Sequence, residues 1–291
     1  MNCFGPGHGA CPGCGFPIAI RGAIEVLDGK VIAVNSTGCL EIVSSMYGRN
    51  TWGIPYIHSL FENAGAVAAG IETALRAMKR DGEAHVVVFA GDGATFDIGI
   101  GTLSGMMDRD HNVIYICYDN EAYQNTGNQQ SMATPPGANT TTTPVGKLQP
   151  GKIGKKKDMV SIAVAHGIPY AASASIAYPK DFQRKVKRAS EFEGSKYIQV
   201  HAPCVPGWGI DGKITVEVAR LAVETGLYPL VEYDHGKLVR VRKLKHRKPV
   251  EEYIKIQRRF RHLFRHEMGR VILDQLQKIA DENAERYGLD S

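Results

Sequence analysis

The chain has 291 residues, of which 35 are lysine or arginine and 30 are aspartate or glutamate, so its formal net charge is +5. Hydrophobic residues make up 43% of it and charged residues 22%, which is typical of globular proteins and excludes disordered, fibrous and coiled-coil classes. No apolar run approaches the roughly 18 residues of a membrane span, and the first residues lack a charged head followed by an apolar stretch. We therefore expect a cytoplasmic protein with no membrane segment.

The first third of the chain predicts a loop followed by alternating helices and strands. Residues 3–15 are rich in glycine, proline and cysteine, which predicts a loop held by something other than its own backbone hydrogen bonds. A helix is expected over residues 17–27 and a short buried strand over 31–34. Apolar residues then recur at helical spacing over residues 61–80.

Three continuous apolar runs predict strands buried on both faces: HVVVFA at 85–90, VIYICY at 113–118 and YIQVH at 197–201. Strands that alternate with helices of this length indicate an α/β protein with a doubly wound, mostly parallel sheet. Residues 125–157 show no apolar period, and so long a stretch inside a domain is usually a binding loop or a lid.

Glycines and polar side chains follow two of these strands. Gly91-Asp92-Gly93 comes directly after residues 85–90, and Asn120 follows the next strand. Ligands of doubly wound sheets bind at the carboxyl ends of strands, where glycines let backbone amides approach a phosphate. A carboxylate there suits Mg²⁺ or Ca²⁺ bridging a diphosphate. The structural alternative is a simple turn at the glycines.

Four cysteines have a spacing that indicates a metal site. Cys11 and Cys14 form a CxxC pair, and Cys39 and Cys204 stand alone. Four thiolates can bind a zinc ion or a [4Fe–4S] cluster, and spacing alone does not separate the two. Cys117 lies within the second predicted strand and is expected to be part of the core.

Six motifs in the same order resemble the β subunit of 2-oxoacid:ferredoxin oxidoreductases, most closely the pyruvate-oxidising members. Among them, GDG followed by an asparagine 28 residues after its aspartate resembles the diphosphate-binding motif of thiamine diphosphate enzymes. The motifs are CPGCG near the N-terminus, NSTGCLE at 35–41, WGIPYIHSLFENAGAVAAG at 52–70, FAGDGATFDIG at 89–99, ICYDNEAYQNTGNQQS at 116–131 and HAPCVPGWG at 201–209.

The resemblance implies thiamine diphosphate, a Mg²⁺ or Ca²⁺ ion and one [4Fe–4S] cluster. Residues of the family's diphosphate-binding motif correspond to Gly91, Gly93 and Tyr123. The family's metal ligands correspond to Asp92, Asn120 and the carbonyl of Ala122. The family's cluster ligands correspond to Cys11, Cys14, Cys39 and Cys204. Cys39 would bring cluster and cofactor together and so take part in catalysis.

Three further residues match positions around the family's cofactor. Asn125 matches a catalytic position that hydrogen-bonds the substrate, and the structural alternative is a turn beside Gly127. His58 and Glu62 match positions at the rim of the cofactor pocket. Helix capping is the alternative there, with Ser59 as the N-cap and Glu62 completing a capping box.

The implied activity is the reversible oxidative decarboxylation of pyruvate with coenzyme A to acetyl-CoA and CO₂, with the electrons passing to ferredoxin. A glutamate that thiamine enzymes require comes from another subunit in this family, so we expect the chain to be inactive without α, γ and δ subunits.

Residues 1–240 would form the thiamine diphosphate-binding domain, of the diphosphate type, with its N-terminal cluster-binding loop. Residues 241–291 would form a basic helical extension that packs on this domain or on partner subunits.

Two alternatives remain open at this point. The same chemistry could act on another 2-oxoacid, such as 2-oxoglutarate, a branched-chain oxoacid or oxalate. A zinc-stapled α/β binding module without catalysis would instead be colourless.

Nucleic-acid binding is not expected, because the basic residues are not interleaved with aromatics and the isoelectric point of 8.8 is below the usual level of about 9. Lys155, Lys156 and Lys157 are hypothesised to attract coenzyme A phosphates.

Overall fold

In the computed structural model, which describes residues 3–290, eight strands form one sheet in the order β2-β1-β3-β4-β6-β5-β7-β8. The first six in this order run parallel, and β7 and β8 add two antiparallel strands at one edge. The strands are β1 (Val31–Ser36), β2 (Tyr56–Ser59), β3 (His85–Gly91), β4 (Val113–Asp119), β5 (Tyr170–Ser175), β6 (Lys196–His201), β7 (Val231–Asp234) and β8 (Lys237–Val241).

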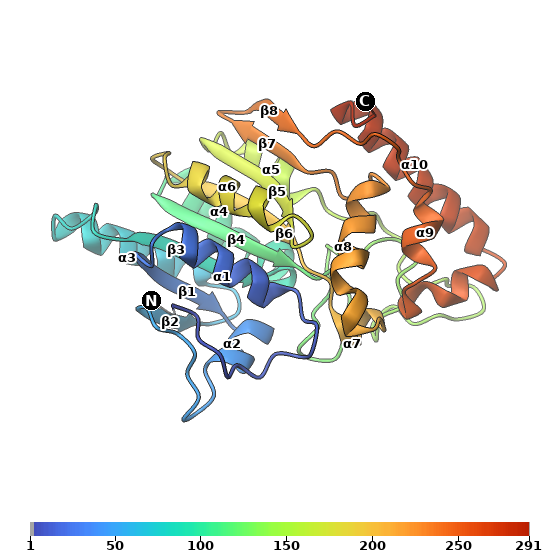
Figure 1. Ribbon diagram of the computed structural model, residues 1–291, viewed down its shortest axis with the longest axis horizontal. Coiled ribbons are helices and arrows are strands. Elements are labelled where there is room, and N and C mark those ends of the chain that lie inside the picture. The colour runs from blue at the N-terminus through green and yellow to red at the C-terminus, as the bar shows by residue number, and fades with distance from the viewer. Residues whose placement is uncertain (1–2, 291) are drawn as a thin grey trace.

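Helices cover both faces of this sheet (Figure 1). Helices α1 and α6 pack on one face, and α3, α4 and α5 pack on the other. The helices are α1 (Phe16–Val26), α2 (Cys39–Ser44), α3 (Ala64–Ala77), α4 (Ile100–Asp108), α5 (Met159–Ala165), α6 (Pro179–Ala189), α7 (Val205–Trp208), α8 (Thr215–Glu224), α9 (Val250–Ile254) and α10 (Gly269–Tyr287). Shorter helical turns are η1 (Gly93–Ile98), η2 (Gly212–Ile214) and η3 (Arg258–Phe264).

Successive residues of the central strands face opposite sides, so each face has its own core. On β3, Val86 and Val88 belong to the core under α3 and α4, while Val87 and Phe89 belong to the core under α1 and α6. This period of two along a continuous apolar run is what a strand buried on both faces requires.

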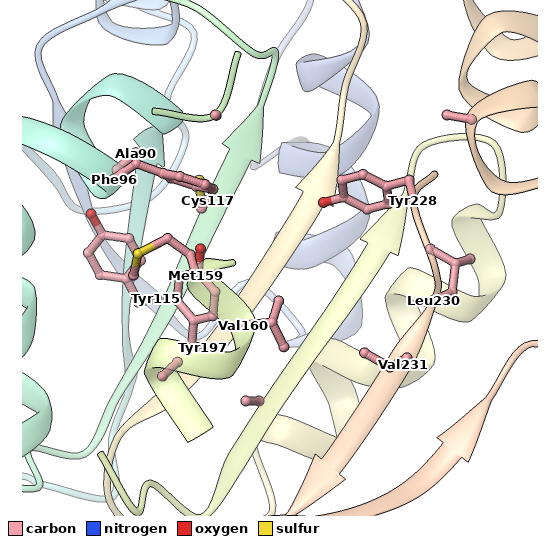
Figure 2. Packing of buried hydrophobic residues seen from close by; sticks show 14 of the residues in the cluster. Ala90, Phe96, Tyr115, Cys117, Met159, Val160, Tyr197, Tyr228, Leu230 and Val231 are labelled. Atoms are coloured by element: carbon pink, nitrogen blue, oxygen red, sulfur yellow. The ribbon is translucent and has the colours of Figure 1, made fainter. Parts of the chain in front are cut away.

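The core on the α5 side of the sheet is shown in Figure 2. Tyr115 of β4 and Tyr197 of β6 stack with ring centroids 6.1 Å apart, and Met159 of α5 packs in the same cluster. Cys117 is fully buried there, which confirms the expectation that it is a core residue.

The predicted helices and strands are present, with ends shifted by a few residues. Strands β2, β5, β7 and β8 were not predicted. The predicted capping box at Ser59 is wrong, because Ser59 ends β2 and helix α3 begins later, after Asn63. The Ser59 hydroxyl instead donates to the carbonyls of Asn35 and Leu60, at 3.4 and 3.2 Å.

The segment predicted to lack regular structure contains no helix or strand within the described residues between β4 and α5. Its backbone is nevertheless held in place. Gly137 N donates to the Lys152 carbonyl at 2.7 Å, and Asn139 N donates to the Arg259 carbonyl at 3.0 Å. The second bond ties this long loop to η3, so the C-terminal segment packs against the loop. Over residues 3–290, no helix is both long and apolar enough to cross a membrane.

Candidate cofactor and metal site

Four parallel strands end next to the residues that the sequence analysis singled out. Strand β1 leads to Cys39, β3 to Asp92, β4 to Asn120 and β6 to Cys204. Because parallel strands present their carboxyl ends at one edge of a sheet, residues far apart in the sequence come together there.

Asp92 is buried, with 1% of its surface exposed, at the point where β3 turns into η1. Its Oδ1 accepts a hydrogen bond from Asn120 N at 3.2 Å, and its Oδ2 accepts one from Ser131 Oγ at 2.5 Å. Burial, and then the nearby Asp119 carboxylate, raise the pKa of Asp92 well above its usual range. A bound divalent cation would offset both causes, because positive charge favours the ionised carboxylate.

The side chain of Asn120 lies between Asp92 and the carbonyl of Ala122. With its amide nitrogen facing them, it donates to Asp92 Oδ1 at 2.8 Å and to Ala122 O at 2.9 Å. With its amide oxygen facing them, three oxygen atoms converge, an arrangement that a hard cation satisfies. Mg²⁺ and Ca²⁺ take such ligands, and Mg²⁺ completes its shell with phosphate oxygens and water. The three groups therefore fit a divalent cation carried with a diphosphate.

A cleft of about 500 Å³, open to solvent, lies beside these oxygen atoms. Eight of the predicted site residues line it, namely Cys39, Gly91, Asp92, Gly93, Asn120, Ala122, Tyr123 and Asn125. Gly93 has to be a glycine here, since a Cβ at this position would lie 2.5 Å from the Tyr123 ring. Asn125 is exposed, so its amide is free to meet a bound molecule.

The two residues predicted at the rim of the cofactor pocket, His58 and Glu62, do not line the cleft. His58 Nε2 is 2.7 Å from Thr37 Oγ1, and it is Thr37 that lines the cleft. Glu62 supplies its backbone carbonyl, which accepts a 2.6 Å hydrogen bond from Thr102 Oγ1, while the adjacent Phe61 lines the cleft. Sequence reasoning missed Thr37, although its position directly before Gly-Cys at a strand end was a usable signal.

The four thiols predicted to bind a cluster lie on three segments that meet beside the cleft. Cys11 and Cys14 are on the N-terminal loop, Cys39 begins α2, and Cys204 precedes α7. Gly13, with φ of 79°, forms the turn between the first two. A Cβ on Gly13 would lie 2.5 Å from backbone atoms of η2, so the turn requires glycine to approach that closely.

The thiols are near enough to affect each other's ionisation. Burial first, and then the charges of the other three thiols, raise the pKa of Cys14 to about 12. The pKa of Cys39 rises to about 12 through burial, Cys204 and Cys11, and that of Cys204 to about 11 mainly through burial. Thiolates are the form that binds metal, so bound metal ions would be needed to keep these buried groups ionised.

Cys39 joins the two candidate sites, because its thiol lies with the other three and the residue also lines the cleft. In the part of the chain that the structure describes, no three His, Cys, Asp or Glu residues are placed to hold one metal ion together. A [4Fe–4S] cluster differs from such a site in that each of its four thiolates binds a separate iron atom.

A cluster of buried charges behind the cleft was not predicted. Lys156 Nζ donates to Asp119 Oδ2 at 2.6 Å and to Glu121 Oε1 at 3.0 Å. Arg259 Nη2 donates to Glu121 Oε2 at 2.5 Å. Although burial acts in the opposite direction, Lys156 and Arg259 lower the pKa of Glu121 to about 2. The long loop and the C-terminal segment are thus both anchored next to Asn120.

The three consecutive lysines of the loop do not form a common phosphate-binding surface. Lys156 is committed to the buried carboxylates, and Lys157 donates to the carbonyl of Phe96. Lys155 is exposed, with its Nζ 3.8 Å from Glu282 Oε2. This arrangement argues against the hypothesis that the three bind coenzyme A phosphates together.

Comparisons with known proteins agree with this geometry. Residues 36–200 match the family model described as thiamine pyrophosphate enzyme, C-terminal TPP binding domain. The pyruvate synthase subunit PorB of Methanothermobacter marburgensis is 53% identical over 91% of this chain and 92% of its own length. PorB of Thermotoga maritima is 45% identical over 96% and 89%. The ketoisovalerate oxidoreductase subunit VorB of Pyrococcus abyssi is 43% identical over 97% and 91%.

A solved structure of 2-oxoglutarate:ferredoxin oxidoreductase from Magnetococcus marinus aligns with a TM-score of 0.58 and 27% identity, over 72% of this chain and 76% of that one. The alignment and the family match confirm the predicted α/β fold and the resemblance on which the cofactor predictions rest. This chain belongs to the family of pyruvate synthase PorB subunits, which are oxidoreductases, and it contains a thiamine pyrophosphate-binding domain.

Proposed function

We propose that this chain is the subunit of a pyruvate:ferredoxin oxidoreductase that binds the diphosphate end of thiamine diphosphate and one [4Fe–4S] cluster. The assembly would convert pyruvate and coenzyme A to acetyl-CoA and CO₂, reversibly, with two electrons passed to ferredoxin. The observation that best supports this proposal is that a cleft lined by Asp92, Asn120 and Ala122 meets four thiols at the carboxyl ends of the strands, with Cys39 common to both groups.

The metal site is assigned to three groups of this chain. Asp92, Asn120 and the Ala122 carbonyl would hold Mg²⁺, or Ca²⁺, against the diphosphate. Asp92 supplies the negative charge, and the two neutral oxygens complete the protein's share of the shell. Gly91 and Gly93 keep this wall of the cleft free of side chains. When bound, thiamine diphosphate supplies the electron sink that loss of CO₂ requires.

The redox site is assigned to the four thiols Cys11, Cys14, Cys39 and Cys204. When bound, the cluster would accept electrons one at a time. Since Cys39 also borders the cleft, the electrons would cross a short distance. Asn125 would hydrogen-bond the substrate, while His58 would act on the cleft through Thr37 and Glu62 would belong to its rim.

The relatives are named as enzyme subunits, which supports the proposal that this chain works with partner subunits. We infer that an α subunit supplies the glutamate opposite the aminopyrimidine ring, and that γ and δ subunits complete the electron path. Residues 1–240 would act as the cofactor domain, and residues 241–291 as an extension packed on it or on partners. Pyruvate is the favoured substrate because most of the similar relatives are named pyruvate synthase, and a VorB relative makes a branched-chain oxoacid the second candidate.

The test uses the assembled enzyme, purified without oxygen, with Cys14→Ala as the variant and Cys117→Ala as its control. Both changes remove one thiol, but Cys117 is fully buried within strand β4 and is not one of the four thiols assigned to the cluster. We expect Cys14→Ala to lose about four iron atoms per chain and part of the visible absorption. The control should keep its iron and absorption.

Two results would contradict the redox assignment. Unchanged iron in Cys14→Ala would show that this thiol holds no cluster. Loss of one zinc ion in place of iron would establish the zinc-stapled alternative. Wild-type enzyme that contains no thiamine diphosphate and does not bind it with Mg²⁺ would contradict the cofactor assignment separately.

A further inference from the structure

Glu121 lies between two of the groups assigned to the metal ion and has an unusual backbone conformation. Its φ is 65°, in the left-handed region that residues other than glycine, asparagine and aspartate rarely adopt. This turn lets the Asn120 amide lie 2.9 Å from the Ala122 carbonyl and 2.8 Å from Asp92 Oδ1. The conformation of Glu121 therefore decides whether the two groups can share one ion.

The carboxylate of Glu121 is held by two cations from distant parts of the chain. Its Oε1 accepts from Lys156 of the long loop at 3.0 Å, and its Oε2 accepts from Arg259 of η3 at 2.5 Å. Glu121 and Arg259 are each 5% exposed, so salt in the solvent screens their attraction little. The Glu121 carboxylate lines a separate cavity, together with His201, and not the cofactor cleft.

The peptide groups around Glu121 are held as well. Trp208 Nε1 donates to the Asn120 carbonyl at 2.9 Å, and the Arg259 guanidinium lies 3.7 Å from the centre of the Trp208 ring. Thr134 Oγ1 donates to the Glu121 carbonyl at 2.6 Å. A residue in a sparsely populated conformation persists when the surrounding contacts fix it in this way.

We propose that Glu121, clamped by Lys156 and Arg259, is a positioning residue that sets how tightly the chain binds the metal ion and thiamine diphosphate. The inference rests on the proposed function, because it takes Asn120 and Ala122 as metal ligands. Without the clamp, the turn at Glu121 relaxes toward a right-handed or extended conformation and the two oxygens separate. The reacting groups are untouched, so cofactor affinity falls while turnover at saturating cofactor is kept.

The test is Glu121→Gln in the assembled enzyme, with Glu232→Gln as the matched control. Glu232 is also a buried glutamate, 4% exposed, and it accepts two hydrogen bonds from Arg184, at 3.2 and 2.7 Å. After removal of bound metal and cofactor, equilibrium dialysis gives the dissociation constant of thiamine diphosphate with Mg²⁺. Electron paramagnetic resonance gives the dissociation constant of Mn²⁺. We expect Glu121→Gln to raise both dissociation constants about tenfold or more. Glu232→Gln should change neither dissociation constant by more than about twofold.

The outcomes separate this inference from the proposed function. A wild-type enzyme that binds neither ligand overturns the proposed function. A wild-type enzyme that binds both, with Glu121→Gln binding equally tightly, overturns the positioning role. Equal weakening in both variants also overturns it, because the cause would then be general destabilisation.

A second variant covers failure of Glu121→Gln to fold or assemble. Arg259→Lys keeps the positive charge but removes the planar group that contacts both Glu121 and Trp208. It should weaken thiamine diphosphate binding severalfold with unchanged turnover at saturating cofactor. Unchanged affinity in Arg259→Lys would overturn the proposal.

Discussion

Glu121 and Glu232 are both buried and both paired with arginine, but they lie in different kinds of structure. Glu232 is on strand β7, which pairs with β5, and its partner Arg184 is on helix α6, which packs in the core through Phe182 and Val186. Strand and helix are already placed by backbone pairing and apolar contacts. We therefore expect the ion pair between them to add only to stability.

Glu121, in contrast, lies in a segment that no helix or sheet ladder fixes. Its backbone is left-handed, and its partners come from the long loop and from the C-terminal segment. The comparison indicates that a buried ion pair determines local geometry where regular structure is missing, and contributes mainly energy where regular structure is present.

The largest expected effect separates the proposed metal ligand Asp92 from the proposed positioning residue Glu121. Asp92→Asn removes the carboxylate charge proposed to hold the ion, so we expect thiamine diphosphate and Mg²⁺ to bind about a hundredfold more weakly or worse, since loss of an outer-shell partner alone costs 10–100-fold. The cofactor-free protein should unfold at a higher temperature than wild type, because Asp92 is buried beside Asp119 and burial disfavours its charge.

Thermal unfolding with and without cofactor measures both effects in one experiment. Glu121→Gln should instead lower the unfolding temperature of the cofactor-free protein, since it removes the carboxylate paired with Arg259 and leaves Lys156 with Asp119 alone. If Asp92→Asn lowers the stability of the cofactor-free protein, its carboxylate is a structural group and the contrast between ligand and positioning residue is wrong.

The second prediction concerns pH and the histidine that faces the Glu121 cluster. His201 Nε2 lies 3.8 Å from Glu121 Oε1, and Lys156 and Arg259 are also near it. Burial lowers the pKa of His201 to about 3, and the attraction of Glu121 opposes this only in part. The unfolded chain therefore binds a proton below pH 6.5 that the folded chain does not bind. We expect about 2 kcal/mol of stability to be lost as pH falls from 6.5 to about 5.

Denaturant unfolding of wild type and His201→Phe at pH 7 and at about pH 5 checks this prediction. Neither ring nitrogen of His201 has a hydrogen-bond partner among the described residues, so phenylalanine loses no such bond. It also keeps the packing against Trp208 and Tyr228. The variant should lose less stability on acidification than wild type, and an equal loss would assign the pH dependence to other groups.

The regular part of the molecule was predictable where strands carry continuous β-branched runs, as in β3 and β4. Strand β5 was missed because its sequence, YAASAS, consists mostly of small residues with weak strand preference. What places β5 is its pairing with β6 on one side and β7 on the other. Tertiary context of this kind leaves no local pattern in the sequence.

The residues of the candidate site also fall into a group that the sequence predicts and a group that it does not. Asp92 and Asn120 were predictable because each directly follows a recognisable strand, and the Cys11–Cys14 pair has a local spacing. The bond between Glu121 and Arg259 joins residues 138 positions apart, and a left-handed glutamate contradicts its own backbone preference. Sequence reasoning therefore found the groups proposed to bind the ion and the cluster, and missed those proposed to position them.

The smallest expected effect tests whether Arg259 acts only through the Glu121 carboxylate. Trp208→Phe keeps a ring beneath the Arg259 guanidinium but removes the N–H group that donates to the Asn120 carbonyl at 2.9 Å. One such hydrogen bond contributes about 0.5–1.5 kcal/mol, so thiamine diphosphate with Mg²⁺ should bind about two- to tenfold more weakly. Equilibrium dialysis on the assembled enzyme measures this change.

Trp52→Phe is the matched control for this last variant. Trp52 is also buried, and its Nε1 donates to Ser44 Oγ at the same distance, 2.9 Å, but it does not line the cleft. Equal weakening in both variants would mean that any lost tryptophan bond loosens the fold. Weakening in Trp208→Phe alone would mean that Arg259 positions Asn120 along two paths, one through the Glu121 side chain and one through the indole. If Trp208→Phe binds the cofactor as tightly as wild type, Arg259 positions Asn120 only through the Glu121 carboxylate. Loss of that contact should then account for the whole effect of Arg259→Lys.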